Sequence, residues 1–186
     1  STWRNLNPDY EYRLSDDQEC IDFISENYSK RHLAAYLALT PPAFRADFWR
    51  YLVLYKMGGV YVDIDCVANM PLSAVLNDGG SFVSAAERRV VPGIFNAFMA
   101  CAPRLPVLKH IIDKIIIHTN IEHYPQPHPS DAWTHILDIT GPVALSNSLL
   151  FLNKQPKYTK LPYGRHTDVK LLRYDRQWVY AADDQI

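Results

Sequence analysis

Apolar residues recur at helical spacing in six segments of the chain. Ser15, Asp16 and Asp17 supply a helix N-cap and an acidic first turn ahead of the first segment. The clearest pattern begins at two prolines and ends at two glycines, residues that favour a helix start and a left-handed C-terminal cap. The predicted helices are one that follows Asp17 and the segments 32–39, 42–57, 94–101, 106–118 and 142–152.

Two short segments have the character of strands. Residues 10–14 alternate between apolar and polar positions, and residues 60–66 are rich in β-branched side chains. Helices interleaved with short apolar strands predict an α/β fold. The sequence has no internal repeat, low-complexity tract or flexible linker, so a single domain is expected over residues 1–186.

Composition narrows the class of protein. With 48% hydrophobic and 21% charged residues, the chain resembles an ordinary globular domain. A net charge of −1 gives no general basic field, so nucleic acid is not an expected partner. Residues 154–176 are locally basic, which indicates either a solvated face or a rim that faces phosphate or acceptor. No apolar stretch approaches the ~20 residues of a membrane span, so no transmembrane segment is expected.

The cysteines give a weak indication of the cellular compartment. Cys20, Cys66 and Cys101 are odd in number and widely spaced, which suits a reducing environment better than a disulfide framework. The cytoplasm is slightly favoured on this ground. The Golgi lumen stays open if a targeting segment has been removed from the chain.

The chemistry centres on Asp63 and Asp65, near the end of the second predicted strand. On a strand these two carboxylates and Tyr61 share one side, while Val62 and Ile64 face the core. Two such carboxylates repel each other unless a cation or hydrogen-bond donors compensate. Mg²⁺ and Mn²⁺ take oxygen ligands and commonly share their shell with substrate phosphates. An ordinary exposed strand end explains a bare Asp-x-Asp equally well.

The preceding helix adds a second pair of charged residues. Asp47 and Arg50 are three positions apart, so both project from one face of the helix. They could form an exposed intrahelical ion pair, but the surrounding aromatic residues favour a helix packed into the domain. Arg50 could then place its planar fork on a phosphate or sugar oxygen, and Asp47 could accept hydrogen bonds from sugar hydroxyls.

These residues carry a family resemblance. Residues 45–51 and 54–65 resemble the DXD sugar-binding region of glycosyltransferase family 32. The order Asp-x2-Arg-x10-Tyr-x-Asp-x-Asp is also similar to that of the clostridial glucosylating toxins, which are structural relatives. Residues 3–10, 94–99 and 140–142 resemble further blocks of the family.

The resemblance implies a GT-A-like fold, which is a Rossmann-like mixed sheet flanked by helices, and a UDP- or GDP-sugar as donor. Asp65 would bind Mn²⁺ (or Mg²⁺) directly, and Asp63 would contact ribose, donor sugar or metal. Asp47 and Arg50 would hold the donor sugar and its phosphate, and Tyr61 would line the nucleotide pocket.

Three features of the chain relate less clearly to the family pattern. Asn96 would lie near the donor sugar or the acceptor, or would simply be a polar residue at a helix start. The family's first strand is missing or replaced at the start of this chain. The His and Trp residues that usually complete the metal or diphosphate site have His166 and Trp178 as candidates, although a lone histidine such as His166 is more often a surface residue.

The resemblance implies transfer of a sugar, with retention of configuration, from a nucleotide-diphosphate donor to a hydroxyl of a glycan, lipid or protein acceptor. Two alternatives use the same residues. A haloacid-dehalogenase-like phosphatase would use Asp63 as nucleophile and Asp65 as acid/base, but this leaves Asp47 and Arg50 without a role. A non-catalytic module that binds sugar nucleotides or glycans is the second alternative.

Overall fold

The computed structural model describes residues 1–76, 81–87, 93–120, 137–153 and 169–172. Its centre is a sheet of four strands, β1 (Gly59–Val62), β2 (Phe82–Glu87), β3 (Gly93–Cys101) and β4 (Val169–Leu172), in the order β1-β3-β2-β4. β3 pairs antiparallel with both β1 and β2, whereas β2 and β4 are parallel. The mixed sheet agrees with the predicted α/β class.

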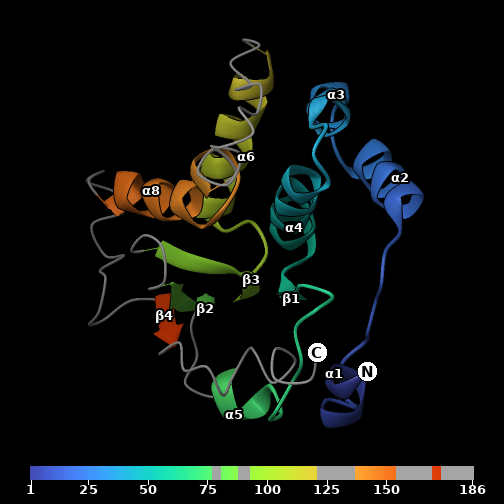
Figure 1. The fold of residues 1–186 in the computed structure, drawn as a ribbon, viewed down its shortest axis with the longest axis vertical. Helices are drawn as coiled ribbons and strands as arrows, with labels where there is room; N and C mark the ends of the chain where they lie inside the picture. The colour runs from blue at the N-terminus through green and yellow to red at the C-terminus, as the bar shows by residue number, and fades with distance from the viewer. Residues whose placement is uncertain (77–80, 88–92, 121–136, 154–168, 173–186) are drawn as a thin grey trace.

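Helices lie on both sides of this sheet. Figure 1 shows α4 (Pro42–Met57), α6 (Pro106–Asn120) and α8 (Pro142–Asn153) above the row of strands. Two short helices, α1 (Thr2–Leu6) and α5 (Ser73–Leu76), lie below it. α2 (Asp17–Asn27) and α3 (Lys30–Ala38) extend the upper layer beside α4.

The core lies between the sheet and the upper helices. α4 and α6 pack against each other, and α8 packs on β3. Their facing side chains are fully buried, among them Phe48 and Tyr51 of α4 and Ile111 and Ile115 of α6. Each buried side chain of this size stabilises the fold by about 1.5–3 kcal/mol relative to an exposed one. α4 is therefore held firmly, which matters because it carries two of the candidate site residues.

A glycine turn directs the chain from α4 into β1. Gly58 has φ 68°, in the left-handed region. A Cβ there would lie 2.7 Å from the side chain of Pro103 and 2.9 Å from the carbonyl oxygen of Cys101. Only glycine meets both demands, so the helix ends here and β1 starts one residue later.

The helix predictions are largely confirmed. The helix after Asp17 is α2, where Asp16 and Glu19 form a capping box, and the segments 32–39, 42–57, 106–118 and 142–152 correspond to α3, α4, α6 and α8. None of the described helices is long and apolar enough to cross a bilayer.

Two other predictions are wrong. The segment 94–101 is not a helix but lies in strand β3. Because both faces of the sheet are covered, β3 is apolar at most positions and lacks the alternation that indicates a strand. Residues 10–14 form no strand, because no described strand pairs with them. Most of the basic segment 154–176 lies outside the described residues, and so do His166 and Trp178.

Candidate functional site

The two acidic residues of the motif lie in a turn rather than on a strand. β1 ends at Val62, and the amide of Cys66 donates to the carbonyl oxygen of Asp63 at 3.0 Å, which closes a turn over residues 63–66. The strand predicted over residues 60–66 is confirmed only as far as Val62, and the expectation that Ile64 faces the core is wrong, since Ile64 is 85% exposed. Asp65 is exposed as well, and its direction follows from the turn instead of strand alternation.

A bulge in the neighbouring strand explains why β1 stops there. The pairing of β2 and β3 shifts from Ser84 opposite Met99 to Ala85 opposite Phe95, so residues 96–98 have no partner on β2. The buried Ser84 hydroxyl lies 2.7 Å from the carbonyl oxygen of Phe95 and 3.0 Å from that of Phe98, and so bridges the bulge. The carbonyl of Ala97 accepts from the amide of Asp63 at 2.9 Å. The bulge therefore directs polar groups of β3 towards the acidic turn.

Arg50 connects α4 to this turn. Its Nη1 lies 3.0 Å from Oδ1 of Asp47, and its Nη2 lies 2.9 Å from Oδ1 of Asp63. Its guanidinium carbon is 5.0 Å from the ring centre of Tyr61, whose hydroxyl donates to Asp63 Oδ1 at 3.0 Å. The side chains of Arg50 and Asp47 are only 5% and 7% exposed, so this is not the exposed intrahelical pair.

The carboxylate of Asp47 is held on three sides. Besides Arg50, it accepts from Nδ2 of Asn96 at 2.9 Å and from Oγ1 of Thr140 at 2.7 Å. Asn96 reaches this carboxylate from the bulge. The backbone carbonyl oxygen of Asn96 accepts from Nη1 of Arg50 at 3.0 Å. The hydroxyl of Tyr51 lies 3.1 Å from Asn96 Nδ2 and donates to the carbonyl oxygen of Thr140 at 2.7 Å. All five residues are buried.

Burial and charge set the protonation of this cluster. Burial raises the pKa of Asp47, while Arg50, Thr140 and Asn96 act in the opposite direction by favouring the carboxylate. Burial alone would lower the pKa of Arg50, but the neighbouring carboxylates, Asp47 above all, outweigh it and raise that pKa. Burial also raises the pKa of Tyr61, so its hydroxyl stays protonated and remains a donor to Asp63.

The acidic turn offers oxygen atoms that suit a hard divalent cation. The contacts of Asp63 with Arg50 and Tyr61 both use Oδ1, and no contact with another described residue engages Oδ2. The exposed carboxylate of Asp65 contacts no other described side chain. Within the described ranges, no three His, Cys, Asp or Glu side chains gather into one cluster. Two carboxylates leave room for water and phosphate, which fits the habit of Mg²⁺ and Mn²⁺.

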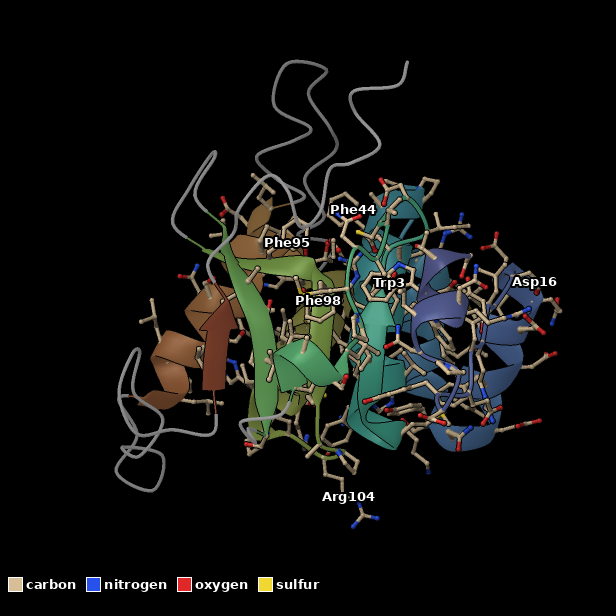
Figure 2. All side chains as sticks on the ribbon, turned by 90° about the horizontal axis from the view of Figure 1, so that it is seen from below. Trp3, Asp16, Phe44, Phe95, Phe98 and Arg104 are labelled. Atoms are coloured by element: carbon tan, nitrogen blue, oxygen red, sulfur yellow. The ribbon has the colours of Figure 1, made fainter. Side chains whose placement is uncertain are left out.

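The N-terminal residues brace the acidic turn from the other side of the sheet. The ring of Trp3 stacks on Phe98 with centroids 6.1 Å apart, and its Nε1 donates to the carbonyl oxygen of Cys66 at 2.7 Å (Figure 2). The hydroxyl of Thr2 accepts from the amide of Ala68 at 3.0 Å. α1 thereby fixes the backbone directly after Asp65.

Of the residues predicted for the site, five form one connected cluster: Asp47, Arg50, Tyr61, Asp63 and Asn96. Asp65 follows in the same turn, on the surface. The sequence-based reasoning missed Thr140, Tyr51 and Ser84. Thr140 belongs to the recognised block 140–142, which could have indicated it, but only folding brings a residue 93 positions away onto Asp47.

Comparisons with known proteins show what the chain is similar to. Residues 1–82 match the family described as "Glycosyltransferase sugar-binding region containing DXD motif". Inositol phosphoceramide mannosyltransferase 3 of Schizosaccharomyces pombe is 33% identical over 143 residues, which are 76% of this chain and 36% of that protein. Initiation-specific alpha-1,6-mannosyltransferase of Candida albicans is 34% identical over 89 residues, 47% of this chain and 23% of that protein. The chain thus spans well under half the length of these relatives.

A solved structure supports the fold. The glycosyltransferase PaToxG superposes with a TM-score of 0.51 and 19% identity, over 69% of this chain and 43% of that one. This likeness is consistent with the GT-A-like architecture expected from the sequence. The resemblance to glycosyltransferase family 32 is confirmed, since residues 1–82 of the chain match the sugar-binding region containing the DXD motif.

Proposed function

We propose that the chain forms the donor-binding part of a glycosyltransferase, which moves a sugar from a nucleotide-diphosphate donor to an acceptor hydroxyl. The observation that carries this proposal is the bridge from Asp47 through Arg50 to Asp63, next to the exposed Asp65. The bridge lies within the segment that matches the sugar-binding region. A strand end with two unremarkable aspartates would not need a buried arginine between two carboxylates.

The relatives suggest mannose as the transferred sugar, since those described above are named mannosyltransferases. A GDP- or UDP-sugar is the donor that the family resemblance implies. Glycan, lipid and protein acceptors were all open from the sequence. The relative named for inositol phosphoceramide matches 76% of this chain, whereas the alpha-1,6-mannosyltransferase matches 47%. A lipid-linked acceptor is therefore the first one to test.

Asp65 and the free Oδ2 of Asp63 would hold Mn²⁺ or Mg²⁺. When bound, such a cation neutralises the negative charge that grows on the departing diphosphate. The chain itself keeps Asp63 in place, because Arg50 and the protonated hydroxyl of Tyr61 both bind its Oδ1.

The contacts also support retention by front-side attack. A double-displacement route needs a carboxylate that is free to attack the sugar. Asp47 is buried and accepts from three partners, so it is not available as a nucleophile, and the proposed role of Asp63 and Asp65 is to hold the cation. The phosphatase alternative gains no support from any comparison, and a non-catalytic module stays as an outcome of the test.

The test is a screen for Mn²⁺-dependent hydrolysis and transfer with GDP-mannose, UDP-glucose, UDP-galactose and UDP-N-acetylglucosamine, using inositol phosphoceramide as the first acceptor. Asp65→Ala should lower turnover by at least about a hundredfold, since it removes a metal ligand. Asp9→Ala, at another exposed aspartate in a turn, is the matched control and should leave turnover unchanged. Binding without turnover would indicate the non-catalytic module, and no binding of any donor would refute the proposal.

A further inference from the structure

Thr140 lies outside the matched segment and yet contacts the charged cluster. Its side chain is fully buried, and its hydroxyl donates to Oδ2 of Asp47 at 2.7 Å. The residue stands at the turn that leads into α8, and its carbonyl oxygen accepts from Tyr51 of α4. The C-terminal half of the chain therefore takes part in a site whose charges all come from the N-terminal half.

From Thr140 a continuous series of polar contacts leads to the acidic turn. Asp47 binds the hydroxyl through Oδ2 and Arg50 through Oδ1, and Arg50 binds Asp63 through its other terminal nitrogen. Every link before Asp63 is buried, where hydrogen bonds are electrostatically stronger and more demanding in geometry than in water. A change at Thr140 should therefore alter the position of Asp63.

The charges indicate what this series is for. Arg50 shares one positive charge between two carboxylates, so Asp47, Arg50 and Asp63 together carry one net negative charge. Asp65 adds another. A site of this sign repels a diphosphate and attracts a divalent cation.

We propose that Thr140 is a positioning residue, which sets the place of Asp63 through Asp47 and Arg50. This inference rests on the proposed function. The rival is a purely structural role, in which the Thr140 hydroxyl only satisfies the buried carboxylate of Asp47. The two roles predict different effects on Mn²⁺ affinity when the Thr140 hydroxyl is removed.

The experiment compares Thr140→Val, which removes the hydroxyl at nearly constant volume, with Thr140→Ser, which keeps it. Ser148→Ala is the matched control, since among the described residues that buried hydroxyl bonds only to a carbonyl of its own helix, 2.9 Å away. Affinity for Mn²⁺, titrated with GDP present, should fall by about three- to tenfold in Thr140→Val. This loss is smaller than the roughly 10–100-fold typical of residues that bind a metal ligand directly, because Thr140 acts through Asp47 and Arg50. Thr140→Ser should restore it, and Ser148→Ala should not change it.

A double-mutant cycle separates positioning from general destabilisation. If Thr140 acts through Arg50, then Thr140→Val should have little further effect on Mn²⁺ affinity in an Arg50→Lys background. Unchanged Mn²⁺ affinity in Thr140→Val, or fully additive effects in the cycle, would overturn the proposal.

Failure of the proposed function would look different. If the wild-type chain binds no Mn²⁺, the metal-dependent function falls, and crystal structures of the variants then decide the positioning claim. Loss of the contact between Arg50 and Asp63 in Thr140→Val but not in Ser148→Ala would support it. The same 2.9 Å contact in both variants would refute it.

Discussion

The α4–β1 segment and the bulged strand β3 contribute to one site in different ways. The first supplies all of the charge, from Asp47, Arg50 and Asp63, within 17 positions of sequence. The second, together with Thr140, supplies neutral donors and acceptors that hold those charges in place. Charged groups could not stay buried without such partners. The chemistry is therefore local in sequence, whereas its support is not.

The largest expected effect comes from removing the positive charge. Arg50→Met should lower the free energy of unfolding by about 3–5 kcal/mol, because it leaves buried Asp47 without its counter-charge. Urea denaturation followed by circular dichroism would measure the loss. Arg13→Met is the control, since Arg13 pairs with Glu11 on the surface, where solvent screens the pair and its loss should hardly change the free energy of unfolding. Equal losses in the two variants would contradict the buried bridge.

The same variant should show a characteristic dependence on pH. Burial already raises the pKa of Asp47, and removing Arg50 takes away the main opposing charge. When a carboxyl has a higher pKa in the folded state than in the unfolded state, its protonation stabilises the folded state. The loss of unfolding free energy in Arg50→Met should therefore shrink as pH falls through the pKa of folded Asp47. A penalty that stays constant between about pH 7 and pH 4 would count against an ionised Asp47.

An intermediate effect is expected at the bulge, in the second region. Ser84→Ala leaves the carbonyl groups of Phe95 and Phe98 without the hydroxyl that bridges them, at a cost of about 1–3 kcal/mol. Donor affinity should fall too, because the bulge presents Asn96 to Asp47. Ser148→Ala, which removes a hydroxyl bound within its own helix, should cost less in stability and leave donor affinity unchanged. Loss of stability without any loss of donor affinity would limit Ser84 to a purely structural role.

The contrast also explains what the sequence could predict. Helix periodicity, prolines and the glycine pair located α4 to the residue, and charge spacing identified the residues whose side chains meet. The bulge could not be predicted, because β3 is apolar at most positions and was taken for a helix. Thr140 was recognised only as part of the family-like block 140–142, since its contact with Asp47 exists only after α8 packs on β3.

The smallest effect is expected where the cluster meets solvent. Tyr61→Phe removes the hydrogen bond to Asp63 but keeps the ring against Arg50, so it should cost about 0.5–1.5 kcal/mol of stability. Tyr12→Phe is a matched control, because the Tyr12 ring also lies against an arginine, Arg4, at 4.8 Å. Titration of Mn²⁺ with GDP should show a modest loss of affinity in Tyr61→Phe and none in Tyr12→Phe. If both variants bind Mn²⁺ as the wild type does, Arg50 alone positions Asp63, and the first region needs no help from the hydroxyl of Tyr61.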